Sequence, residues 1–194
     1  MGATKIQICN LASLKLGAPI INSLTENSEH TVIINYVYEF MVEEVLEAHD
    51  WDFAIARSSA LALAVSDPIG WSYGYAKPSG AVRVICMADD TSFLPAEPFA
   101  VEGDYIYTNL ETAYCKYVGR GSDPLKFSQL FVDALAWRIA AEAAYRVTGK
   151  REKAGEMWDG FYKALARAEE SSFLASIRST DLTYTDEIIN AGVA

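Results

Sequence analysis

DWDFAIARSSALALAVSDPIGWSYGYAKP occupies residues 50–78 and separates two differently patterned parts of the chain. Two tryptophans, a phenylalanine and two tyrosines flank an apolar, alanine-rich run, and a Lys-Pro step closes the stretch. Before it, apolar residues recur at helical spacing. After it, they first alternate as in strands and then become helical again. We therefore expect a helical scaffold interrupted by a β insertion.

The composition is that of a folded domain with enough apolar material for a core. The 194 residues fit one domain, and a hydrophobic content of 51% excludes global disorder. The formal net charge of -10 argues against a protein that grips nucleic acid, because phosphate neutralisation requires clustered Lys and Arg. The chain has no apolar run of about 18 residues, so no transmembrane helix is expected, and residues 1–6 do not begin a secretory signal.

Two helices are expected before the aromatic stretch. Residues 6–16 have helical spacing and end at Gly17, with Pro19 beyond it. A longer helix of about six turns ends near His49, since Ile33, Val37 and Met41 repeat on one face. Its other side carries four acids: Glu39, Glu43, Glu44 and Glu47. We interpret this acidic cluster as a solvated face, in preference to a metal or catalytic site.

A small β part is expected in the middle of the chain. Residues 51–65 are ambiguous, because their alanine content favours a helix whereas Phe53 and Ile55 permit a short strand. Residues 82–87 are a predicted strand. Residues 98–118 alternate with period two around turns at Gly103 and Asn109, which predicts further antiparallel strands. Such a small sheet needs a larger body to pack against.

Two more helices follow, and the pattern is then lost. Asp123 and Pro124 combine an N-cap with a proline at the first helical position, so a helix is expected to begin there and to end at Gly149. The next helix is expected over residues 150–176. Beyond Arg178 the sequence is too polar and β-branched to continue it, so residues 179–194 are predicted to form an extended arm. The apolar residues of this arm are Leu182, Tyr184, Ile188 and Ile189.

The predicted fold class is α+β and mainly α. It is a single domain over residues 1–194, with a helical bundle formed by residues 4–66 and 123–178. Residues 71–120 form the inserted antiparallel β lobe, and residues 179–194 form the arm.

The sequence contains no motif for metal or cofactor chemistry. Its two histidines, His30 and His49, belong to no zinc motif, and no EF-hand, phosphate-binding loop or nucleophile elbow is present. The three cysteines are far apart in apolar contexts, which indicates buried free thiols in a reducing compartment: Cys9, Cys86 and Cys115. We expect no cofactor, no metal and no enzymatic activity.

The order of features resembles the tail tubular protein A family, the head-to-tail adaptors of short-tailed bacteriophages. The resemblance rests on a Trp at the end of an acidic helix, an FAxAR-like segment at 53–57 and an aromatic block closed by a Pro at 71–78. A VEGDYIYTN hairpin at 101–109 and a YxxYV-like strand at 114–118 follow, and then a long Asp-Pro helix. The signature positions are Trp51, Phe53, Arg57, Trp71, Tyr73, Tyr75 and Pro78.

This resemblance implies a structural virion protein of the phage neck, made in the host cytoplasm. It would form a dodecameric ring between the portal protein and a tail nozzle similar to tail tubular protein B, with double-stranded DNA passing through the lumen during genome ejection. An acidic subunit would not trap DNA electrostatically. The arm at residues 179–194 would dock on the portal. No membrane partner is implied.

Two alternatives remain open at the level of sequence. A virion-associated glycan hydrolase would need two carboxylates across a cleft, drawn from Asp50, Asp52, Asp89 and Asp90. Trp71, Tyr73 and Tyr75 can also stack on sugars or bases, although core or interface packing is favoured because no basic residues surround them. A cytoplasmic helical interaction protein unrelated to phage is the other alternative.

Overall fold

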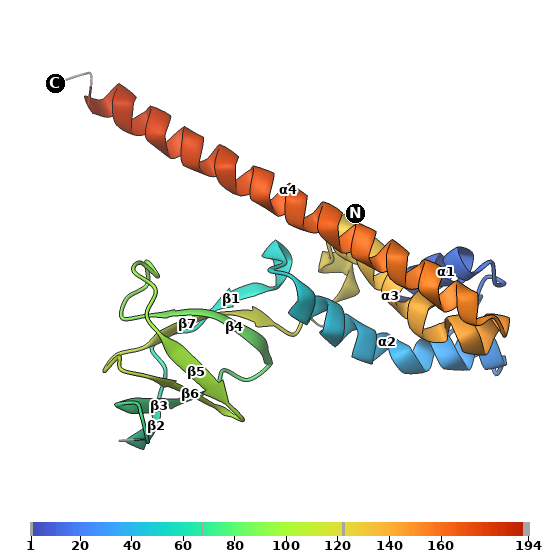
Figure 1. Cartoon of the computed structure of the whole chain (residues 1–194), viewed down its shortest axis with the longest axis horizontal. Coiled ribbons are helices and arrows are strands. Elements are labelled where there is room, and N and C mark those ends of the chain that lie inside the picture. The colour runs from blue at the N-terminus through green and yellow to red at the C-terminus, as the bar shows by residue number, and fades with distance from the viewer. Residues whose placement is uncertain (1, 67, 122, 192–194) are drawn as a thin grey trace. The chain divides into compact units, whose positions relative to one another are not determined.

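Figure 1 shows the computed structural model of the chain, which describes residues 2–66, 68–121 and 123–191, with side chains as far as Leu174. The chain forms two compact units, of which the first contains residues 1–41 and 128–194 and the second residues 42–127. Over the described residues there are four α-helices and seven strands in two antiparallel sheets. The predicted combination of helices with an antiparallel β part is therefore confirmed.

Helices make up the first unit, and local sequence signals delimit them. Helix α1 (Lys5–Leu16) begins with a capping box between Thr4 and Gln7 and ends at Gly17, whose φ of 70° completes the C-cap. Helix α2 (Glu29–Ala48) runs from this unit into the second. Helices α3 (Gln129–Thr148) and α4 (Arg151–Ala191) complete the set.

Helix α3 is the central element of the first unit, since it packs against both α1 and α4. Its apolar residues extend most of the way round, and many of them are alanines that allow neighbouring helices to approach closely. The fully buried side chains include Phe131, Leu135 and Ile139.

The second unit contains all the described strands. They are β1 (Ile55–Arg57), β2 (Leu63–Ser66), β3 (Tyr73–Ala76), β4 (Ala81–Ala88), β5 (Phe99–Glu102), β6 (Tyr105–Thr108) and β7 (Tyr114–Gly119). One sheet has the order β1-β7-β4 and the other the order β2-β3-β6-β5. The predicted strand at 82–87 is β4, and the predicted hairpin is β5–β6, turned at Gly103 with a φ of 60°. Buried side chains from both sheets form one core, which includes Tyr75, Met87, Ile106 and Cys115.

The β part begins earlier than the sequence predicted. Residues 55–57 and 63–66, assigned above to the helical bundle, form β1 and β2. Helix propensity is a weak local preference, and here cross-strand pairing overrides it: Ile55 lies opposite Val118, and Leu63 lies opposite Tyr75.

The Asp123-Pro124 signal is real but starts a shorter element than predicted. The Asp123 carboxylate accepts from the backbone N–H of Leu125 and caps a single 3-10 turn, Pro124–Lys126. Phe127 then takes an extended conformation and is buried, which interrupts the helix. Helix α3 starts only after Ser128, whose hydroxyl accepts from the N–H of Phe131.

The fourth helix does not end near residue 176, and the predicted extended arm is wrong as a backbone conformation. Helix α4 continues to Ala191, because extending an existing helix is far easier than nucleating one, even through β-branched residues. The side chains of Leu182, Tyr184, Ile188 and Ile189 lie outside the described side chains.

Candidate functional site

The aromatic signature lies in the second unit, and its first member is a core residue. Trp51 is only 4% exposed, and its indole Nε1 donates to the carbonyl oxygen of Val45 at 2.7 Å. The rings of His49 and Phe53 lie 4.9 Å and 6.4 Å from it, and Phe53 in turn lies 5.4 Å from Phe127. This hydrogen bond and these ring contacts give Trp51 a structural role in the second unit.

Tyr75 is the buried member of the second aromatic block. Its hydroxyl lies 2.7 Å and 2.8 Å from the carbonyl oxygens of Leu110 and Glu111, so strand β3 is tied to the segment after β6. Burial raises the pKa of this phenol, which keeps it a neutral donor. Tyr73 packs against the same core as a partly buried neighbour.

Trp71, Arg57 and Pro78 are less buried than Trp51 and Tyr75. Trp71 is only partly buried, since it lies in the turn closed by its N–H to the Pro68 carbonyl, before β3 begins. Arg57 is exposed at the end of β1. Pro78 follows β3 and accepts from the N–H of Ala81, in a turn that leads into β4. The signature is therefore not one site: it joins a core tryptophan, a strand and a turn.

Asp50 lies far from Asp89 and Asp90, so these acids do not form a catalytic pair across a cleft. Asp50 forms an ion pair with Arg83 on β4, whereas Asp89 and Asp90 follow the far end of the same strand. Six residues of strand separate Arg83 from Asp89, roughly 20 Å, whereas catalytic carboxyl pairs lie about 5–10 Å apart.

Asp90 is also unsuited to a general acid. Its carboxylate accepts from the Ser92 hydroxyl at 2.6 Å and from the Ser92 N–H at 2.8 Å, and these hydrogen bonds lower its pKa. A glycosidase acid needs a raised pKa instead. Asp90 therefore organises its own loop.

A long-range network that the sequence did not reveal joins three helices of the first unit. Asp133 of α3 binds Lys15 of α1 at 2.8 Å and Arg167 of α4 at 2.5 Å. The Lys15 ammonium also lies 3.9 Å from the ring centroid of Trp137. These residues are far apart in the sequence, so no local pattern could have indicated that they meet.

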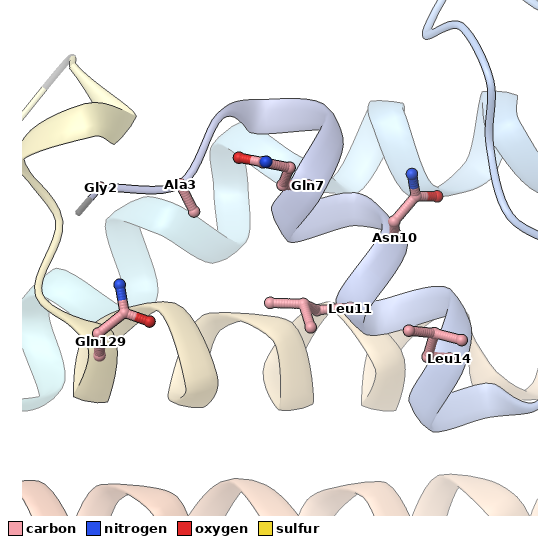
Figure 2. Close-up of a pocket in the computed structure, with 7 residues that line it drawn as sticks. All are labelled: Gly2, Ala3, Gln7, Asn10, Leu11, Leu14 and Gln129. Carbon is pink, nitrogen blue, oxygen red and sulfur yellow. The ribbon is translucent and has the colours of Figure 1, made fainter.

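The first unit also has an apolar pocket, shown in Figure 2. It has a volume of about 590 Å³ and is lined on α1 by Leu11 and Leu14, with the amides of Gln7 and Asn10 on the same helix. Gln129, at the start of α3, completes it together with Gly2 and Ala3. Its lining contains no charged side chain, so it is suited to a neutral, apolar occupant.

Helix α4 is about twice as long as the helix it packs on. At about 1.5 Å per residue, the 20 residues of α3 extend about 30 Å and the 41 residues of α4 about 60 Å. The short connection at Gly149 folds α4 back along α3 (Figure 1). Ala168 is the last buried side chain of α4 within the described range, and Phe173 and Leu174 are 65% and 48% exposed.

Little in the described residues points to metal or membrane chemistry. Searched as far as the side chains are described, the chain brings together no group of three or more His, Cys, Asp or Glu placed to hold a metal ion. Nor is any helix within the described ranges both long and apolar enough to cross a membrane.

All three cysteines are free. Burial raises the pKa of Cys9 to about 11 and that of Cys115 to about 12, whereas Cys86 is partly exposed. The two buried thiols are thus protonated at neutral pH and behave as small apolar side chains.

Comparisons with known proteins add no relative to this picture. No family model matches the chain, and no curated protein matches it in sequence.

Proposed function

We propose that this chain is a structural virion protein: a head-to-tail adaptor that forms a ring between the portal and the tail nozzle of a short-tailed phage. DNA would pass through the lumen of a ring that is dodecameric by the resemblance. In this proposal the first unit is the helical bundle of the adaptor and the second unit is its β lobe. The protein would act by assembly and would catalyse no reaction.

The observation that carries the proposal is the length of α4, which is about twice that of α3. Half of this helix extends beyond the reach of α3, and its described part already exposes Phe173 and Leu174. A helix with exposed apolar side chains is a typical element for docking into a groove on another protein. The portal is the partner that the sequence resemblance indicates.

Charge supports the same function. With a net charge of -10, the chain is repelled by DNA, as the wall of a conduit should be, because phosphate-binding surfaces would hold the passing genome. Asp50 is paired with Arg83 and Asp90 accepts from Ser92 in its own loop, which gives no support to the hydrolase alternative.

Truncation after Arg178 tests the docking role. The last described buried side chain of α4 is Ala168, so the shortened chain should keep its melting temperature while losing affinity for portal rings. A full-length variant with serine at Leu182, Tyr184, Ile188 and Ile189 should behave like the truncation if these side chains make the contact. Undiminished loading of both variants onto the portal would contradict the proposal.

A further inference from the structure

The outer face of α2 carries an exposed apolar stripe that no described part of the chain covers. It consists of Val32, Tyr36 and Phe40, which are 52%, 72% and 61% exposed. The three residues are four positions apart and therefore lie along one side of the helix. The rings of Tyr36 and Phe40 are 5.9 Å apart, so they form one continuous aromatic surface.

This stripe is surrounded by negative charge. Helix α2 contains five glutamates and neither Lys nor Arg. At about 100° per residue, four of the glutamates project from the same side as the stripe: Glu29, Glu39, Glu43 and Glu47. Glu39 is paired with Lys5 at 2.9 Å and Glu43 with Arg120, which leaves the face acidic.

The opposite charge is concentrated at the connection between α3 and α4. Residues 145–153 contain four of the sixteen Lys and Arg of the chain and one acid. The cations are Arg146, Lys150, Arg151 and Lys153. We call these residues the cationic end.

The cationic end also offers apolar surface and a concavity. Tyr145 is about half exposed, and the Arg151 guanidinium lies 5.6 Å from its ring centroid. Beside it, Pro19 and Val147 line a pocket of about 360 Å³ together with Lys150 and Lys153. An aromatic side chain followed by carboxylates fits such a surface, because cations pair with both.

We propose that a second copy of this chain covers the stripe and does so with its cationic end. The two surfaces are complementary in charge, and both belong to the first compact unit. The two surfaces are also distinct patches of the chain. On α2, His30 lines the pocket beside the cationic end, whereas Val32, two residues further along, is exposed on the stripe. The contact is therefore heterologous, joining different surfaces of successive copies, as a ring requires.

This inference rests on the proposed ring and assigns the surfaces that close it. Electrostatic complementarity guides the encounter and fixes the orientation, while the buried aromatic pair supplies the affinity. Association of the full chain, measured by sedimentation velocity over a concentration series, should therefore weaken as salt is raised.

Two blocked variants test the assignment, and each has only one of the two surfaces disrupted. Tyr36→Ser/Phe40→Ser removes the stripe, and Arg146→Glu/Lys150→Glu reverses the cationic end. Each should raise the apparent dissociation constant of self-association about thirtyfold or more, equivalent to about 2 kcal/mol. If the double stripe variant does not fold, Tyr36→Ser alone serves, because that side chain is largely exposed.

Mixing the two blocked variants gives the decisive readout. The first retains a cationic end and the second retains a stripe, so an equimolar mixture should form dimers with one intact contact and no larger species. Dimers in the mixture, with neither variant associating alone, are expected only for a head-to-tail contact.

Matched controls use surfaces outside the proposed contact. Leu14→Ser removes an apolar side chain of comparable exposure, 60%, from the pocket of Figure 2. Lys126→Glu/Lys163→Glu changes the net charge by the same amount as the charge-reversal variant. Both controls should associate like the unchanged chain.

Three results would overturn the inference. They are a chain that stays monomeric at every soluble concentration, blocked variants that associate normally, and a mixture that forms no dimers. If Leu14→Ser is the only variant that loses association, the interface lies at the pocket of Figure 2 instead. Failure of a correctly assembled ring to bind portal would contradict the proposed function and leave this interface standing.

Discussion

Gly160 of α4 lies directly against the indole of Trp137 of α3. A Cβ atom built on Gly160 would stand 2.3 Å from Cε3 of that ring and 2.6 Å from Cδ2, closer than real contacts allow. Because Lys15 of α1 lies 3.9 Å from the same ring's centroid, the indole on α3 contacts both α1 and α4. Glycine at position 160 is what permits this approach of α3 and α4.

Gly160→Ala should therefore destabilise the protein despite alanine's better helix propensity. Forcing apart a packed pair costs about 1–3 kcal/mol. Gly155 of the same helix is the matched control, because its added Cβ would meet nothing within 4 Å. Gly155→Ala should stabilise by about 0.4–1 kcal/mol. Urea unfolding of both variants measures the difference, and equal effects would show that the helices are not in contact at Gly160.

The two signature tryptophans should differ in their importance for stability. Trp51→Ala removes a buried ring and its hydrogen bond to Val45, at a cost of about 3–5 kcal/mol. Trp71→Ala should cost only about 1–2 kcal/mol, because less apolar area leaves contact with the core at a partly buried position. Thermal unfolding of the two variants measures this difference. A larger loss of stability for Trp71→Ala than for Trp51→Ala would contradict the burial of the two rings.

The unfolding free energy should decrease on acidification because His30 takes up a proton more readily in the unfolded state. The Ser13 hydroxyl lies 3.0 Å from His30 Nε2 and donates its own proton to the Cys9 carbonyl, so Nε2 carries the ring proton of a neutral imidazole. Burial lowers the pKa of His30, opposed by the charge of Glu26.

The sign of this effect follows from linkage. The folded pKa lies below the unfolded value of about 6.5, so on acidification the unfolded state binds the proton first. The unfolding free energy therefore decreases as the pH falls from about 7 towards the folded pKa. His30→Gln should lose less stability over this interval. Parallel melting curves of the two proteins across the same pH range would contradict the assignment.

Thiol reactivity should separate the three cysteines. Cys9 and Cys115 are buried with raised pKa values, whereas Cys86 is partly exposed. A thiol reagent at pH 8 should modify Cys86 first, and Cys86→Ser should remove the rapid phase. Unfolding in denaturant should expose all three thiols. Rapid labelling of Cys115 in the folded chain would show that the β core is open.

The elements best predicted from sequence were those with local signals. Helix α1 has a capping residue and a glycine stop, and the hairpin at Gly103 has both alternation and turn chemistry. The errors came where a distant partner decided the outcome. Residues 55–57 and 63–66 are strands because Ile55 pairs with Val118 and Leu63 with Tyr75, which local composition cannot reveal. The length of α4 is likewise not predicted, because the local polarity of residues 179–191 does not show that an existing helix can extend through them.

The candidate surfaces were predicted less well than the fold. The sequence identified the acidic side of α2 but not that Tyr36 and Phe40 stand among those acids, because helical spacing alone does not say which face is covered. The cationic end at Lys150 depends likewise on the chain reversal between α3 and α4. Both surfaces emerge only when the burial of each face is known.

The central claim, that the chain is a ring-forming adaptor, is tested most directly by imaging. Particles formed by mixing the full-length chain with its cognate portal protein should be recorded by electron microscopy and averaged along the portal axis. The account predicts an additional ring of protein coaxial with the portal, which disappears when the chain is truncated after Arg178. Portal rings that remain bare beside a monomeric chain would contradict it.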